Sequence, residues 1–127
     1  MSLSNHLGVG VDIESISRFV KVNQTKDHLF LDKIYTEEEL NYCFSKKNPA
    51  QHLAARFAGK EAVVKALNCL EYPFSDFKKI EISNNEEGVP KVRINQPDFK
   101  KINLKISLSH CEDKAIAFVV AEKNAKR

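Results

Sequence analysis

The sequence is poor in cysteine, histidine and glycine. Its three cysteines are widely spaced without a Cys-x-x-Cys pair, and its four histidines do not cluster, so neither a disulfide framework nor a zinc site is expected. With four glycines, the chain shows no P-loop and no dinucleotide-binding fingerprint. No Ser/His/Asp order or nucleophile elbow indicates acyl-enzyme chemistry.

Long apolar segments are also absent. No uncharged apolar run approaches the roughly 18–20 residues of a membrane-spanning helix. The amino terminus lacks the basic flank and apolar run of a secretory signal. Unpaired cysteines fit a reducing compartment. We therefore expect a cytoplasmic location and no membrane segment.

The length and charge limit the possible partners. A chain of 127 residues favours a single domain, 1–127, which can bury a core without disulfides. The net charge of +3 is mild and permits an acidic partner or a phosphate-rich ligand. Nucleic acid is not expected, because the sequence lacks a dense Lys/Arg stripe and the clustered sheet aromatics of an RNA-recognition motif.

The hydrophobic period changes along the chain from a strand, through helices, to strands. The first strand is expected over Leu7–Ile13, and Thr36 with Glu39 forms a capping box that starts a helix. The expected helices cover 14–22, 27–35, 36–45 and 49–67, and the later strands contain Ile80/Ile82, Val92/Ile94, Leu104/Ile106/Leu108 and Ile116/Phe118/Val120. This order predicts an α+β fold with an antiparallel sheet, one long helix and several short helices.

The last expected strand is apolar on both faces, because alanines and Val119 alternate with Ile116, Phe118 and Val120. Such a strand must be covered on both sides. The helices of the same chain or another subunit could provide the cover, and the sequence leaves both open.

Glu61 is an unusual residue on the long expected helix. At about 100° per residue, it lies at the edge of the apolar stripe, with Lys65 one turn later on the same side. A surface ion pair between Glu61 and Lys65 is one interpretation. The other is a partly desolvated carboxylate that needs a cation, a proton or a donor.

Asp12 is the second candidate, near the end of the first strand and on the face opposite Val9 and Val11. It could be a turn or cap residue entering the next helix. Alternatively, Asp12 and Glu61 could give two oxygens to one hard cation. Magnesium typically takes one or two carboxylates, several waters and the phosphate oxygens of a substrate.

His110 closes the strand segment Ser107–Leu108–Ser109–His110. Its imidazole could carry a proton or donate a hydrogen bond to phosphate. A lone histidine is more often an ordinary strand-end residue, and this interpretation stays open.

Three separated blocks together resemble the holo-acyl-carrier-protein synthase family of 4′-phosphopantetheinyl transferases. The blocks are Gly8–Ile13, like the Gly-x-Gly-x-Asp-Ile strand; Arg56–Leu67, like the Arg-Phe-Ala-Ala-Lys-Glu-Ala-x-x-Lys-Ala helix; and Ser107–His110, like the Ser-x-Ser-His strand end. The resemblance extends from Gly8 to about Val120. The helix block is the most specific of the three.

The resemblance implies a fold, a reaction and a partner. The fold would be that of the phosphopantetheinyl transferases. The enzyme would transfer phosphopantetheine from coenzyme A to a serine hydroxyl of an apo acyl carrier protein, and would release adenosine 3′,5′-bisphosphate. Such an enzyme would act in fatty-acid or related biosynthesis. The carrier and its pathway stay open.

Roles for individual residues follow from the same resemblance. Asp12 and Glu61 would hold Mg²⁺, Lys65 would stabilise charge on the transferring phosphate, and Arg56 and His110 would contact coenzyme A phosphates. Phosphoryl transfer depends on such positioning and charge neutralisation. The base for the serine proton is either Glu61 or a metal-bound water.

The resemblance also implies interaction surfaces. Arg18, with help from Lys21, would face an acidic carrier, and this contact would be sensitive to salt. The assembly would be a homotrimer with active sites between subunits. The main alternative is a non-catalytic module of the same fold that binds a carrier protein or a nucleotide.

Two positions depart from the family pattern. Asn68–Cys69–Leu70 replaces a short Gly-Thr-Gly loop, which leaves the path of this segment open. Gly59 replaces an alanine, at a helix-propensity cost of up to about 1 kcal/mol. Neither change affects a proposed metal ligand.

Overall fold

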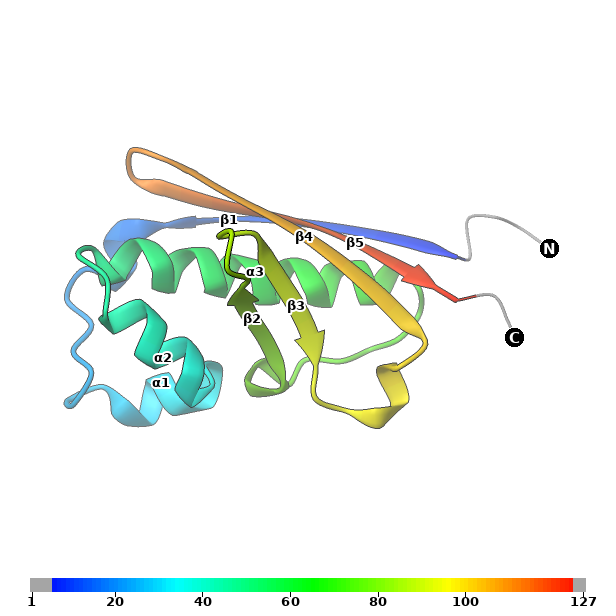
Figure 1. Ribbon diagram of the computed structural model, residues 1–127, viewed down its shortest axis with the longest axis horizontal. Coiled ribbons are helices and arrows are strands. Elements are labelled where there is room, and N and C mark those ends of the chain that lie inside the picture. Colours follow the sequence, from blue (N-terminus) through cyan, green and yellow to red (C-terminus); the bar gives the residue numbers. More distant parts are fainter. Residues whose placement is uncertain (1–5, 125–127) are drawn as a thin grey trace.

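The long helix α3 runs through the middle of the computed structural model, which describes residues 6–124 (Figure 1). An antiparallel sheet of three strands, in the order β1-β5-β4, lies along one side of α3, and two short helices with a two-stranded hairpin lie on the other (Figure 1). The elements are β1 (Leu7–Ser15), α1 (His28–Ile34), α2 (Glu37–Phe44), α3 (Pro49–Cys69), β2 (Ile80–Asn84), β3 (Pro90–Ile94), β4 (Ile102–Cys111) and β5 (Lys114–Lys123).

This arrangement confirms the predicted α+β class. The expected short helix over 27–35, the long helix that begins at Pro49 and the four later strands are all present. Among residues 6–124, no helix combines the length and apolar character needed to cross a lipid bilayer. The prediction that the amino terminus carries no secretory signal concerns residues 1–5 among others, and these five lie outside the described residues.

The predicted helix over 14–22 is wrong. Strand β1 continues through Ser15, which pairs with Lys114 of β5. A single 3₁₀ turn, η2 (Ile16–Phe19), follows, and the Ile16 N–H donates to Asp113 O at 2.8 Å. Pairing with β5 and the β4–β5 turn therefore overrides the helical spacing of the apolar residues.

Strand β1 rests directly on the backbone of α3 through two glycines. A Cβ on Gly8 would lie 2.1 Å from Ala66 O, and one on Gly10 would lie 2.0 Å from Ala62 O. Any side chain at these positions would push the strand away from the helix. Asp12 lies on the same face of β1 as the two glycines and therefore points toward α3.

Gly59 has a packing role within α3. A Cβ there would lie 2.5 Å from Ile82 Cδ1 and 3.1 Å from Ile106 Cδ1. The space that alanine would occupy is filled by these two side chains. The helix propensity lost at Gly59 is offset by this closer packing.

The predicted capping box begins α2. The Glu39 N–H donates to Thr36 Oγ1, and the Glu39 carboxylate accepts the Thr36 N–H at 2.9 Å. This exchange satisfies two backbone donors that the first turn of a helix leaves unpaired.

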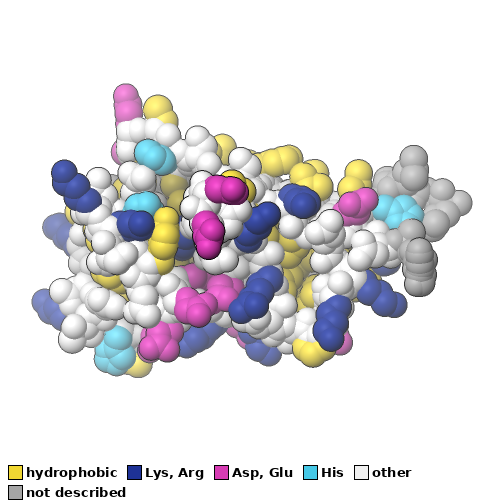
Figure 2. All heavy atoms as spheres, in the orientation of Figure 1, with side chains coloured by type: hydrophobic (Ala, Val, Ile, Leu, Met, Phe, Trp, Pro, Cys, Tyr) yellow, Lys and Arg dark blue, Asp and Glu magenta, His cyan; other side chains and the backbone are white. Residues whose placement is uncertain are grey.

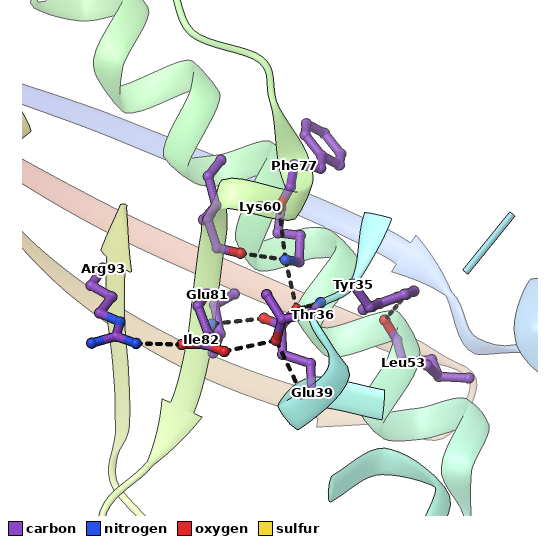
Figure 3. Close-up of polar contacts among 10 residues, drawn as sticks. Tyr35, Thr36, Glu39, Leu53, Lys60, Phe77, Glu81, Ile82 and Arg93 are labelled. Carbon is purple, nitrogen blue, oxygen red and sulfur yellow. Dashed lines mark hydrogen bonds and ion pairs between the residues drawn. The ribbon is translucent and has the colours of Figure 1, made fainter. Parts of the chain in front are cut away.

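Glu39 also belongs to a buried ion pair that joins α2, α3 and β2 (Figure 3). Its carboxylate lies 2.7 Å from Lys60 Nζ and accepts the Ile82 N–H at 2.7 Å. Lys60 is fully buried, and its Nζ also donates to Phe77 O and Ile80 O. All three donor positions of the ammonium group are therefore used.

The segment after Leu67 continues α3 and then stops it. Tyr72 N–H donates to Leu67 O at 2.9 Å, and Glu71 N–H donates to Asn68 O at 3.0 Å. This is the Schellman pattern, in which the turning residue takes a positive φ. Glu71, with φ 63°, occupies the position that glycine usually takes.

The outer face of the three-stranded sheet is apolar and exposed. Figure 2 shows hydrophobic side chains along the upper edge of the molecule, where this sheet lies in Figure 1. The face consists of Leu7, Val9, Val11, Ile13, Ile116 and Phe118, which are 39–58% exposed. The other face of β5, with Ala115 and Val119, is buried. The chain's own helices therefore cover one face of the last strand only.

Candidate active site and cofactor pocket

Asp12 lies within β1, at its contact with α3, and neither ends the strand nor caps a helix. Its Oδ1 lies 3.4 Å from Lys65 Nζ, which also donates to Val11 O at 2.9 Å. Its Oδ2 is buried and has no hydrogen-bond partner. Lys65 thus bonds across to the strand, and within residues 6–124 no ion pair joins it to Glu61. A buried carboxylate oxygen without a donor is costly, and this one is suited to a cation or a ligand donor.

Glu61 is half-buried on α3. Gly8 faces Ala66 and Gly10 faces Ala62, so β1 and α3 run in opposite directions. Two residues of the strand and four residues of the helix each cover about 6 Å. Continuing this register puts Asp12 beside the turn that contains Ala58. Helical side chains lean toward the amino terminus, so the Glu61 side chain also extends toward that turn.

Glu14 is a third carboxylate that the sequence reasoning missed. It follows Asp12 by two residues and shares its strand face, and its side chain is 11% exposed. Burial, and after it the neighbouring Asp12 carboxylate, raise the pKa of Glu14 to about 7, although Arg18 acts in the opposite direction. The period-two pattern would have shown this residue had the strand been extended to Ser15.

The two predicted carrier-contact residues lie on the surface, Arg18 within η2 and Lys21 just after it. Arg18 pairs with Glu14, and its guanidinium carbon lies 5.6 Å from the Phe19 ring centroid and 5.4 Å from that of Phe57. Lys21 is exposed in the turn that follows. Both residues stay accessible to a partner, and their role in carrier binding stays a prediction.

Arg56 and His110 meet in a separate cavity of about 240 Å³. Its polar lining consists of Tyr42, Gln51, His52, Arg56, Asn84, Ser109 and His110. This volume is below the range of whole drug-sized ligand pockets and suits one part of a larger ligand. Neither Asp12, Glu61 nor Lys65 lines it.

Polar contacts and an aromatic ring hold Arg56 and His110 in this cavity. Arg56 is 2% exposed, donates from Nη2 to Asn84 Oδ1, and lies 4.2 Å from the Tyr42 ring centroid. The Nε2 atoms of His110 and Gln51 lie 3.0 Å apart. Tyr42, Gln51 and Asn84 were missed by the sequence reasoning, since they come from α2, α3 and β2 and share no motif.

The carboxylates fit a hard cation that completes its shell elsewhere. Within the described part of the chain, no group of three His, Cys, Asp or Glu side chains could enclose a metal. Asp12 offers an unpartnered buried oxygen. Magnesium commonly takes only one or two carboxylates and keeps waters and phosphate oxygens.

Known proteins resemble this chain over nearly its whole length. The family model of the 4′-phosphopantetheinyl transferase superfamily matches residues 8–119. This chain belongs to that superfamily. A holo-[acyl-carrier-protein] synthase of Thermodesulfovibrio yellowstonii is 48% identical over 113 residues, which cover 89% of this chain and 96% of the relative. One of Chlamydia trachomatis serovar D is 43% identical over 119 residues, which cover 91% and 98%.

A solved structure agrees with this assignment. Helicobacter pylori holo-[acyl-carrier-protein] synthase in complex with coenzyme A has a TM-score of 0.75 and 31% identity, and the match covers 90% of this chain and 99% of that one. In the present phosphopantetheinyl transferase, the three sequence blocks that carried the resemblance lie on β1, α3 and β4. Both strands contact α3, which brings the blocks together.

Proposed function

We propose that this phosphopantetheinyl transferase is a holo-[acyl-carrier-protein] synthase, acting as a single domain. It transfers 4′-phosphopantetheine from coenzyme A to a serine of an apo acyl carrier protein. The match to synthases over nearly their full length supports this proposal. The observation that carries it structurally is the Asp12 carboxylate, which has one oxygen near Lys65 and the other without a partner, in a chain that also holds Arg56 and His110 in one cavity.

The reaction exchanges one phosphorus–oxygen bond for another. The serine oxygen bonds to the phosphorus that carries pantetheine, and the bond from that phosphorus to the bridging oxygen breaks. Adenosine 3′,5′-bisphosphate leaves with the bridging oxygen. The serine proton passes to a base, for which Glu61 is the residue we propose.

Asp12 and Glu61 would hold Mg²⁺, which supplies charge neutralisation to the diphosphate of coenzyme A. Lys65 now shares its ammonium between Asp12 and Val11 O, and its exposed side chain is free to turn toward a phosphate. Arg56 and His110 bind other phosphate oxygens of the cofactor. These residues position the substrate, which is the main contribution of protein groups to phosphoryl transfer.

The carrier would approach over Arg18 and Lys21, whose charges favour an acidic partner. We place the interface of the proposed homotrimer at the exposed apolar face of the three-stranded sheet, because monomers rarely leave such a continuous patch open. Strand β1 carries this face on one side and Asp12 on the other. An interface there would put active sites next to subunit boundaries. A cytoplasmic location fits the free cysteines.

Mass spectrometry of an apo carrier incubated with this protein, coenzyme A and Mg²⁺ tests the proposal. The carrier should gain the mass of phosphopantetheine, and a chelator should prevent the gain. The Asp12→Ala protein provides the matched control for background transfer. Tight binding of the carrier without any mass gain, for several carriers, would instead favour the non-catalytic module.

A further inference from the structure

We infer that Tyr42 and Asn84 are positioning residues that hold Arg56 ready for the 3′-phosphate of coenzyme A. The inference rests on the proposed function and adds two residues that no motif of the chain contains. It starts from the environment of one buried guanidinium.

Arg56 is a buried cation with unused donors. Its guanidinium has five N–H groups, of which Asn84 accepts one from Nη2. The Nε atom is buried and has no partner. A charged donor that is only 2% exposed and incompletely bonded is costly, and Arg56 lines the cavity. An anion in the cavity would relieve this cost.

Tyr42 and Asn84 restrict the guanidinium on two sides. The Arg56 Cζ lies over the Tyr42 ring, 4.2 Å from its centroid. Asn84 is fixed in turn, because its Nδ2 donates to Gly88 O at 3.0 Å in the β2–β3 turn. His52 contacts the Tyr42 ring edge-on, with centroids 5.6 Å apart. Rotation of Arg56 would lose both the stacking and the hydrogen bond.

The charge of the cavity matches a phosphate monoester. No Asp or Glu lines it, whereas Arg56 and two histidines do. Burial lowers the pKa of His52, and the positive charges of Arg56, Lys46 and His110 lower it further. The buried Arg56 guanidinium therefore has no carboxylate in the cavity lining to balance its charge, and a dianionic group would complement it.

Coenzyme A carries one phosphate monoester, on the ribose, and one diphosphate. The proposed metal ligands Asp12 and Glu61 and the nearby Lys65 are absent from the cavity lining. The diphosphate must approach those residues to react. The monoester is therefore the group left for Arg56.

Binding of coenzyme A and of 3′-dephospho-coenzyme A, measured by calorimetry with Mg²⁺, tests this assignment. Tyr42→Leu removes the ring and should weaken coenzyme A binding about 5–30-fold, the range expected for a partly desolvated cation–ring contact. Binding of the dephospho form should change by less than about twofold, because it lacks the group that Arg56 receives. In transfer assays, KM for coenzyme A should rise while kcat stays near the wild-type value.

Two variants sharpen the test. Tyr42→Phe keeps the ring and should restore wild-type preference for coenzyme A. Tyr72→Leu is the matched control, since Tyr72 also has a cation over its ring, Lys123 Nζ at 5.3 Å, but does not line the cavity. It should leave the ratio of the two affinities unchanged. If Tyr42→Leu does not fold, Asn84→Ala is measured in the same way and should also weaken coenzyme A selectively.

Equal weakening of both ligands by Tyr42→Leu would overturn the 3′-phosphate assignment. Unchanged affinities would overturn the positioning role. The two proposals can fail separately. The transfer assay with wild-type protein tests the proposed function, whereas the preference for coenzyme A over its dephospho form is measured by binding and needs no transfer.

Discussion

Replacing Lys60 by methionine should lower the free energy of unfolding by about 3–5 kcal/mol, the usual penalty for removing one partner of a buried ion pair. Methionine has nearly the same length and fills the same space. The substitution therefore removes charge and hydrogen bonds without opening a large cavity. The affected network is drawn in Figure 3.

The magnitude follows from the groups left behind. The Glu39 side chain is 1% exposed, so its charge would lose the ammonium group at 2.7 Å and gain no water in exchange. Phe77 O and Ile80 O would lose a donor as well. Ile82 N–H and Thr36 N–H would continue to donate to Glu39, which limits the penalty. For a chain of this length, the loss corresponds to a fall in Tm of roughly 10–20 °C.

Urea and thermal unfolding at one fixed protein concentration would measure this effect, since association would otherwise shift Tm. The double variant Lys60→Met/Glu39→Gln should recover about 1–3 kcal/mol, because glutamine can still accept the Ile82 N–H without a buried charge. Lys33→Met, at an exposed lysine of α1, is the control and should change stability by less than about 0.5 kcal/mol. A loss below about 1 kcal/mol in Lys60→Met, or no recovery in the double variant, would refute the reasoning.

Four further outcomes are expected. Asp12→Ala and Glu61→Ala should each nearly abolish transfer while circular dichroism shows a folded protein. Normal activity in either variant would refute the metal assignment. Glu61→Gln should fold at least as well as the wild type, because it removes a partly desolvated charge. Arg18→Glu should raise KM for the carrier more than KM for coenzyme A, with a weaker dependence on salt, and equal losses would reject the carrier surface. Glu71→Gly should stabilise the protein by about 0.5–1 kcal/mol in urea unfolding, because glycine adopts the positive φ at this helix end without strain, and destabilisation would show that the Glu71 side chain matters more than its backbone.

Local patterns predicted the elements that local interactions define. The capping box at Thr36 and the helix start at Pro49 depend on residues within one turn, and both are present. The prediction of a helix over 14–22 was wrong because the backbone there is held by β5 and by Asp113 O, about 100 residues away. Only the tertiary pairing reveals that Glu14 shares a face with Asp12.

The residues of the candidate site also fall into two groups, those that the sequence indicates and those that only the fold brings together. Asp12, Glu61 and Arg56 belong to recognisable blocks and could be singled out from the sequence. Tyr42 and Asn84 could not, since each reaches Arg56 only after α2 and β2 fold against α3. The ion pair of Lys60 could not be predicted for the same reason, because its partner Glu39 lies on another helix.

The contact of β1 with α3 through Gly8 and Gly10 also limits how this site can change. The separation of strand and helix is fixed by main-chain atoms, so ordinary changes elsewhere in the core leave it untouched. At position 10, even the methyl group of alanine would lie 2.0 Å from Ala62 O and would force the strand, with Asp12, away from the helix. A chain that keeps this site therefore tolerates no side chain at position 10.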